Sequence, residues 1–296
     1  MRVFTSAATL LHDPGHGHPE RPARLNAVLA VLRSRPDIQL IESAPAALDA
    51  LAGCHDPAYL GRARALSAAG GGELGPDTIL GRASWDAVLG ASGAALAALD
   101  AALTTGVNTF AAIRPPGHHA LGNRAMGFCV VNHAAVVAHT ARRAGRDRVL
   151  IVDWDVHHGN GTQALVEDEP GIRFVSMHQW PWYPGTGAAD ERGVGNIFNV
   201  PMPPGLPAAT YVTALWRAIE RATTDWAPDL LLISAGYDAM RGDPLGGFTL
   251  EPGDFATWVD RLRDRFPGIP IVGLMEGGYA PARLAQGVAA TVTALA

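Results

Sequence analysis

Five short apolar runs rich in Val, Ile and Leu alternate along this chain with longer segments of helical period. The runs lie at residues 109–113, 148–154, 172–177, 229–234 and 270–275, and the N-terminal residues read as a further strand. The helical segments lie at residues 21–35, 85–103, 132–143, 208–226, 254–266 and 282–295. Because the runs are continuously apolar rather than alternating, both faces of the strands should be buried. The pattern predicts an α/β fold, a three-layer α/β/α sandwich around a mostly parallel central sheet.

Length and composition predict one domain over residues 1–296. The 296 residues are 48% hydrophobic and 17% charged, which is too apolar for a disordered chain. No repeat, low-complexity tract or long linker divides them, and a chain of this length can form a core without disulfides. The 2 cysteines, Cys54 and Cys129, are too few for a disulfide framework and are predicted to be small buried residues.

The charge balance argues against nucleic acid and membrane surfaces as partners. The chain has 23 basic and 28 acidic residues, a formal net charge of -5, and no long run of either sign. A cationic substrate is compatible with this mild acidity. No apolar run approaches the roughly 18 residues of a membrane span, so we expect no transmembrane helix and a cytoplasmic location. No sequence feature indicates an oligomeric state.

Loops rich in Gly and Pro follow the predicted strands. They lie at residues 114–119, 157–161, 183–187, 241–247 and 276–279. In open α/β sheets the ligand crevice lies outside the carboxyl ends of the strands. We therefore expect these loops to converge there and to form the functional surface.

Carboxylates and imidazoles directly follow one of the apolar strands. Asp153, Asp155 and His157 alternate in the sequence, so Asp155 and His157 could hold one cation together. Asp238 follows another buried strand and could be the third ligand. An Asp/His/Asp set with open positions is typical of a catalytic metal site. Zinc is the first prediction, and iron or manganese would also accept these ligands.

Two adjacent histidines, His118 and His119, follow a third strand and read as proton-transfer groups beside the metal. Asp153 and Asn160 are candidate partners for the two imidazoles. A carboxylate partner raises the pKa of an imidazole and an amide does not, so the two histidines should titrate apart. Tyr279, after the last strand, could donate a hydrogen bond to a developing oxyanion.

Six motifs in this order resemble the zinc-dependent histone deacetylase superfamily. They are PPGHH (115–119), GFCVVNH (127–133), DWDVHHGNG (153–161), YPGTG (183–187), AGYDAMRGDPLG (235–246) and EGGY (276–279). The segment HDPGHGHPERPARL (12–25) is similar to the bacterial and class II branch. That superfamily also includes histone deacetylase-like amidohydrolases and acetylpolyamine amidohydrolases, and it shares the arginase-type fold.

The resemblance implies a role for each matching residue. It makes Asp155, His157 and Asp238 the zinc ligands, with His118, His119, Tyr279, Asp153 and Asn160 as the catalytic group and His119 as the general base. It makes Gly127, Phe128, Tyr183 and Leu245 part of the substrate tunnel. A structural potassium ion would lie at Asp153, Asp155, His157, Ser176 and Met177.

The function that the resemblance implies is zinc-dependent hydrolysis of acetyl-lysine in proteins or peptides. Acetylpolyamines or other small N-acyl amines are the alternative, although polyamine-selective relatives place an acidic residue at the tunnel mouth, where this chain has the apolar Leu245. A non-catalytic acyl-lysine binding module would have lost a ligand or Tyr279. An arginase-like enzyme with two manganese ions would need further carboxylates at the same strand ends.

Overall fold

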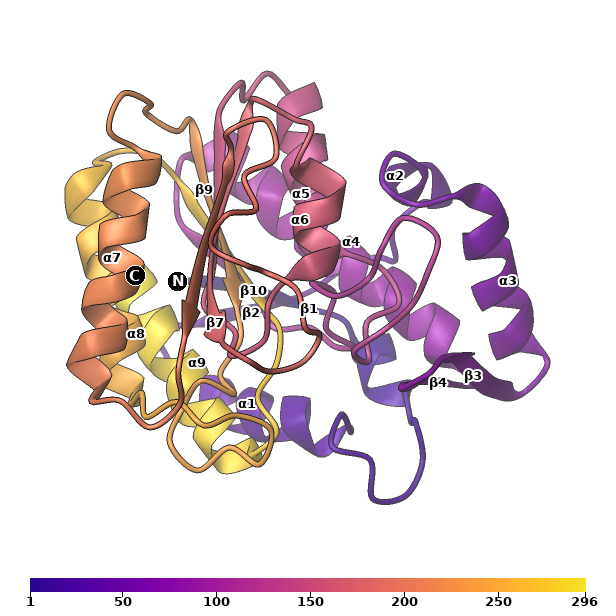
Figure 1. The fold of residues 1–296 in the computed structure, drawn as a ribbon. Coiled ribbons are helices and arrows are strands. Elements are labelled where there is room, and N and C mark those ends of the chain that lie inside the picture. The colour runs from indigo at the N-terminus through magenta and orange to yellow at the C-terminus, as the bar shows by residue number, and fades with distance from the viewer.

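A parallel eight-stranded sheet forms the centre of the computed structural model, which describes residues 1–296 (Figure 1). The strand order is β2-β1-β5-β10-β9-β6-β7-β8, and every neighbouring pair is parallel. The strands are β1 (Arg2–Thr5), β2 (Gln39–Glu42), β5 (Thr109–Ala111), β6 (Val149–Asp153), β7 (Ile172–Gln179), β8 (Ile197–Met202), β9 (Leu230–Ala235) and β10 (Ile271–Met275).

Helices cover both faces of this sheet. One face packs against α1 (Ala23–Arg33), α7 (Ala208–Ala222), α8 (Pro252–Arg265) and α9 (Pro281–Leu295), and the other against α4 (Ser84–Thr105), α5 (His133–Arg143) and α6 (Asn160–Val166). Along β6, Leu150 and Val152 belong to the first apolar core, and Val149 and Ile151 belong to the second. Apolar residues on both faces explain the continuous runs in the sequence and confirm the three-layer prediction.

A smaller unit packs beside the second layer (Figure 1). It consists of α2 (Leu48–Ala52), α3 (Pro57–Ala68) and an antiparallel pair, β3 (Gly71–Gly75) and β4 (Thr78–Gly81). Tyr59 and Trp85 are the large buried side chains of its apolar cluster. A short 3-10 helix, η1 (Ala7–Leu11), packs against α4.

The predicted strands and helices are all present, with ends that differ by a few residues. The edge strands β2 and β8 were not predicted. Both are partly exposed, and β8 contains Asn199 and Pro201, so neither shows a continuous apolar run. Both cysteines are free and buried, as predicted.

Helix α4 is long and apolar enough to cross a membrane by length and composition, although we expected no such helix. In the most apolar 18-residue window, 61% of the residues are buried inside the fold. Burial of this kind is typical of a core helix, and α4 packs against β1, β5 and α5.

Candidate active site

The site lies at the carboxyl ends of four adjacent strands, β5, β10, β9 and β6. The loop after β5 carries His118 and His119, and the loop after β10 carries Tyr279. Asp238 follows β9. Asp153 is the last residue of β6, and Asp155 and His157 come directly after it. Because neighbouring parallel strands end at the same edge, residues up to about 160 positions apart in sequence meet there, for example Gly117 and Glu276.

Asp155, His157 and Asp238 converge on one point. Nδ1 of His157 lies 3.0 Å from Oδ1 of Asp155 and 3.2 Å from Oδ2 of Asp238, and the three ligand atoms all lie within 4.8 Å of one another. Both carboxylates are fully buried. Oδ2 of Asp238 accepts no hydrogen bond, so its lone pairs are available to a cation.

The electrostatics of this cluster also fit a metal ion. Burial and the neighbouring Asp155 raise the pKa of Asp238 to about 7, because two carboxylates close together in a buried site repel each other. A bound cation would relieve that repulsion. The absence of a side chain at Gly277 lets the backbone lie close to Asp238, since a Cβ there would lie 2.1 Å from Oδ2 of Asp238. Imidazole and carboxylate ligands without thiolate suit zinc and also suit iron or manganese.

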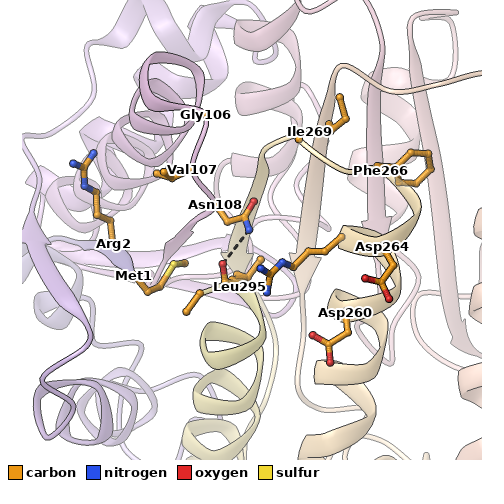
Figure 2. A pocket seen from close by; sticks show the side chains of 13 residues that line it. Met1, Arg2, Gly106, Val107, Asn108, Asp260, Asp264, Phe266, Ile269 and Leu295 are labelled. Carbon is orange, nitrogen blue, oxygen red and sulfur yellow. Dashed lines mark hydrogen bonds between the residues drawn. The ribbon is translucent and has the colours of Figure 1, made fainter.

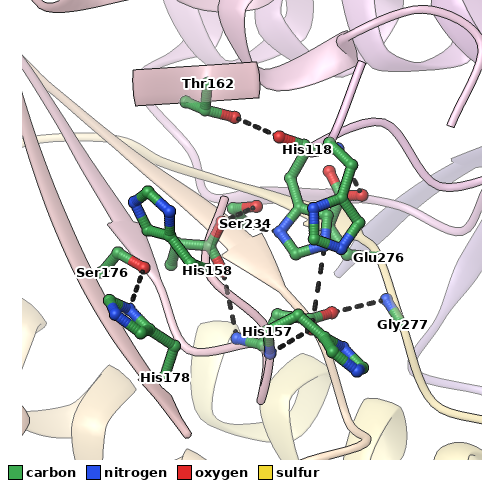
Figure 3. A network of polar contacts seen from close by, with 12 residues as sticks. His118, His157, His158, Thr162, Ser176, His178, Ser234, Glu276 and Gly277 are labelled. Carbon is green, nitrogen blue, oxygen red and sulfur yellow. Dashed lines mark hydrogen bonds and ion pairs between the residues drawn. The ribbon is translucent and has the colours of Figure 1, made fainter. Parts of the chain in front are cut away.

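The two tandem histidines have different partners. Figure 3 shows His118 within its network of polar contacts. Nδ1 of His118 lies 3.1 Å from Oδ2 of Asp153, which also accepts a hydrogen bond from Ser234. Nδ1 of His119 lies 2.7 Å from Oδ1 of Asn160, an acceptor, so Nδ1 carries the proton and Nε2 keeps a free lone pair. His119 therefore has the tautomer that a general base needs.

These partners separate the pKa values of the pair. Burial alone would lower the pKa of His118, but Asp155 and Asp153 outweigh it and raise the pKa to about 10. Burial lowers the pKa of His119, and the neighbouring imidazoles of His118 and His157 lower it further. His118 is thus held protonated while His119 is held neutral.

A cavity of about 230 Å³ lies beside these groups. Its lining residues are Asp77, His119, Gly127, Phe128, His157, Trp182, Tyr183, Leu245 and Tyr279. The ring of Tyr183 packs edge-on against that of His119, with 5.1 Å between the ring centres. The ring of Phe128 packs edge-on against that of Tyr279, with 5.7 Å between the ring centres. The predicted tunnel residues Gly127, Phe128, Tyr183 and Leu245 therefore line one cavity.

Gly127 and Phe128 have unusual backbone conformations at this wall. Gly127 has φ +57°, and a Cβ there would lie 2.2 Å from Cδ2 of His119. Phe128 has φ 67°, which is rare for a residue with a side chain and costs roughly 1–3 kcal/mol. Such strain concentrates at ligand sites, because surrounding structure must hold the residue in place.

The hydroxyl-bearing Tyr279 is held from two sides. Its backbone N–H donates to Oδ2 of Asp243 at 2.6 Å, and the guanidinium of Arg24 lies 4.8 Å from the centre of its ring. Burial raises the pKa of the Tyr279 phenol, although Arg24 opposes this. The phenol therefore keeps its proton and can donate it in a hydrogen bond.

Sequence reasoning missed several residues around this site. Asp77, in the turn between β3 and β4, accepts hydrogen bonds from Gly127 N–H and from the hydroxyl of Tyr183, each at 2.8 Å. Trp182 donates from Nε1 to the carbonyl of Leu245 at 2.9 Å. No motif marked Asp77 or Trp182. Their contacts connect four segments that line the cavity: the turn between β3 and β4 and the segments around Gly127, Tyr183 and Leu245.

A buried ion network behind Tyr279 was also missed. Glu20 binds Arg24 at 3.0 Å and Arg114 at 2.6 Å, and all three side chains are fully buried. Nε of Arg24 donates to the carbonyl of Gly278. Charged residues inside the motifs at 12–25 and 114–119 were the available signal.

The residues predicted to bind potassium are neighbours in the sheet. Ser176 pairs with Asp153 across β7 and β6, and Met177 is the next residue of β7. Both are buried. Potassium binding at Asp153, Asp155, His157, Ser176 and Met177 stays a prediction.

The largest cleft lies elsewhere, at the amino end of the sheet (Figure 2). It measures about 970 Å³ and lies beside Met1, Asn108 and Ile269, which precede β1, β5 and β10. Its charged side chains, Asp260, Arg263 and Asp264 among them, are exposed. No cluster of potential metal ligands lies there, because the structure brings one such cluster together, at Asp155, His157 and Asp238.

Comparison with known proteins agrees with this geometry. A profile of the histone deacetylase domain matches residues 18–295. The chain is 39% identical to the histone deacetylase-like amidohydrolase of Pseudomonas aeruginosa, covering 90% of this chain and 73% of that protein. It is 36% identical to the human polyamine deacetylase HDAC10, covering 98% of this chain and 46% of that protein. The crystal structure of the HDA15 HD domain superposes with a TM-score of 0.95 at 35% identity, covering 99% of this chain and 87% of that one.

Proposed function

The chain belongs to the histone deacetylase family, and from this premise we propose that it is a zinc-dependent hydrolase that removes acetyl groups from lysine side chains of proteins or peptides. The observation that carries the proposal is the buried Asp155, His157 and Asp238 cluster beside a cavity that His157, His119 and Tyr279 line. A slender acylated chain fits such a cavity, with its amide near the cluster.

Asp155, His157 and Asp238 would hold the zinc ion. When bound, zinc supplies a Lewis acid for the acyl carbonyl and lowers the pKa of a water from about 16 to about 7. The three ligands leave room for water and carbonyl, as a catalytic site requires.

The chain's own groups would move the proton and stabilise charge. His119, neutral and with Nε2 free, takes the proton from the attacking water and returns it to the leaving amine. His118, protonated beside Asp153, adds a positive charge that favours the developing oxyanion. The Tyr279 hydroxyl donates a hydrogen bond to the same oxygen.

The cavity mouth supports acetyl-lysine as the substrate. Phe128 and Tyr183 provide aromatic walls for an aliphatic chain, and Leu245 places an apolar side chain at the lining. A polyamine carries a second positive charge, which an apolar mouth binds weakly. Asp77 is the observation that favours acetylpolyamines as the second candidate, since it places one carboxylate at the same mouth. Similarity to a human polyamine deacetylase supports that candidate too.

A direct comparison of substrates tests the proposal. We expect the zinc-loaded protein to hydrolyse an acetyl-lysine peptide with a higher kcat/KM than acetylspermidine. A higher kcat/KM for acetylspermidine would instead make the chain a polyamine deacetylase. Turnover of neither substrate by protein with one zinc ion per chain would contradict deacetylase activity. A cytoplasmic location is part of the proposal and is tested by fractionation of the source cells.

A further inference from the structure

Glu276, the residue that follows β10, is fully buried and takes no part in the proposed chemistry. Its Oε2 accepts hydrogen bonds from the backbone N–H groups of Gly117 at 2.6 Å and His118 at 3.2 Å. Its Oε1 has no hydrogen-bond partner. Burying a carboxylate is costly, and a carboxyl group whose second oxygen is unpaired is not there for stability alone.

The Glu276 side chain joins two loops that carry different parts of the site (Figure 3). Residues 114–119 carry the tandem histidines, and residues 276–279 carry Tyr279. The two bonds to Oε2 are the only hydrogen bonds between these two loops in the structure. The rest of the Tyr279 loop is tied elsewhere: Gly277 N–H donates to Asp155, and Tyr279 N–H donates to Asp243.

Hydrogen bonds also fix the backbone of Glu276 itself. Its own N–H donates to the carbonyl of Ala235 on β9, and its carbonyl accepts from Nη2 of Arg24. The backbone of Glu276 is thus fixed to the sheet and to the buried ion network. A carboxyl oxygen on that fixed backbone can hold two successive N–H groups at once.

We infer that Glu276 is a positioning residue that sets the separation between the tandem imidazoles and the Tyr279 hydroxyl. The inference rests on the proposed function for its catalytic consequence, since the acyl carbonyl must reach both groups. A displacement of about 1 Å in such a pair can cost about 10²-fold in rate. The contact itself is a statement about geometry and holds whatever the substrate is.

Three substitutions separate position from charge. Glu276→Gln keeps an oxygen acceptor at the same reach without the charge. Glu276→Met keeps the length and removes the acceptor. Glu276→Asp keeps the charge but is one methylene too short to reach both N–H groups. If Glu276→Met does not fold, Glu276→Asp still tests the inference, because it keeps a carboxyl group at this position but moves its oxygens away from the two N–H groups.

The test measures kcat, KM and zinc content with an acetyl-lysine peptide, and the hydrogen exchange of the Gly117 and His118 amides by NMR. We expect Glu276→Met to lose about 10²-fold in kcat, with KM within about twofold and zinc content unchanged. Its two amides should exchange at least about tenfold faster. Glu276→Asp should change in the same direction by less, and Glu276→Gln should retain slow exchange and kcat within about fivefold.

Two results would overturn the inference. One is fast exchange of both amides in Glu276→Met or Glu276→Asp with wild-type kcat, because the contact would then not position the site. The other is a loss of kcat in Glu276→Gln as large as in Glu276→Met while the amides stay protected, because charge would then matter and position would not. Failure of the proposed function is distinguishable, since the wild type would then be inactive while the exchange rates would still report the contact.

Discussion

Two clefts open at opposite ends of the same sheet, and the larger one is chemically the poorer. The amino-end cleft measures about 970 Å³, and its charged side chains lie in solvent. The carboxyl-end cavity measures about 230 Å³ and ends among buried carboxylates and imidazoles. Charges in solvent cost a fold little, whereas buried charges are expensive and persist where they serve a function. A buried cluster of carboxylates and an imidazole therefore identifies the site better than cavity volume does.

The sharpest way to break this comparison is to remove one charge at each end. Asp238→Asn should lower kcat/KM by about 10³-fold or more and lower zinc content well below one ion per chain, because the ligand group loses its negative charge. Asp264→Asn in the amino-end cleft makes the same change at an exposed position of α8 and should leave both quantities unchanged. Activity and metal content are measured on the same preparations. Wild-type zinc content in Asp238→Asn would contradict the ligand assignment.

A hydroxyl removed from each of two buried tyrosines sharpens the comparison within the fold. Tyr279→Phe should lower kcat by about 10² to 10³-fold with little change in KM, because the hydrogen bond forms to the developing oxyanion. Tyr59→Phe removes a buried hydroxyl that donates to the carbonyl of Val130, in the apolar cluster of the smaller unit around α2 and α3. That variant should keep kcat within about twofold and lose about 1 kcal/mol of stability. Equal kcat in Tyr279→Phe and wild type would remove Tyr279 from the mechanism.

The buried ion network behind the site should matter for stability where the exposed charges of the amino-end cleft do not. Burial alone would raise the pKa of Glu20, but Arg114, together with His12 and Arg24, holds it well below its usual range. Glu20→Gln should lower the free energy of unfolding by about 3–5 kcal/mol, because two buried guanidinium groups lose their counter-charge. Denaturant unfolding measures this loss, with Asp264→Asn expected within about 0.5 kcal/mol of wild type.

The same buried ion network should make the free energy of unfolding depend on pH. The pKa of Glu20 is lower in the folded chain than its unfolded value of 4.5. Its contribution to the free energy of unfolding is therefore fully present above pH 4.5 and is lost as the pH falls from 4.5 toward the folded pKa. The difference in unfolding free energy between wild type and Glu20→Gln should therefore be constant at neutral pH and shrink below about pH 4.5. A difference that grows on acidification would contradict the ionised state of Glu20.

The smallest effect concerns the mouth of the carboxyl-end cavity. Leu245→Glu should raise the kcat/KM ratio of acetylspermidine to acetyl-lysine peptide by about tenfold, because a carboxylate at the mouth attracts a second ammonium group. Leu245→Gln controls for size and polarity without charge and should change the ratio by less. An unchanged ratio in Leu245→Glu would show that this position does not select the substrate.

Much of the fold was predictable because its central strands are buried on both faces. The runs that became β6, β9 and β10 are continuously apolar, so their ends and the loops after them could be found in the sequence. The edge strands β2 and β8 gave no such signal, because partial exposure allows polar residues such as Asn199. Their pairing depends on the neighbouring strand rather than on their own pattern.

The candidate metal ligands could be predicted because they lie in motifs. The residues that hold the surrounding loops in place could not. Asp155, His157 and Asp238 follow strands that end side by side, so their convergence could be expected. Asp77 lies in a turn of the side unit, and its contact with Tyr183 spans 106 positions. Glu276 lies in a motif, but its bonds to Gly117 and His118 depend on the strand order, in which β10 lies beside β5. Contacts of this kind follow from topology, which the sequence pattern did not specify.

The central proposal is that one zinc ion at the carboxyl end of the sheet supports hydrolysis of acetyl-lysine. Titration of zinc into metal-free protein, with acetate release from an acetyl-lysine peptide measured at each step, tests this directly. We predict that activity rises linearly and levels off at one zinc ion per chain. Activity that does not depend on added metal, or that levels off only at two ions per chain, would contradict the account.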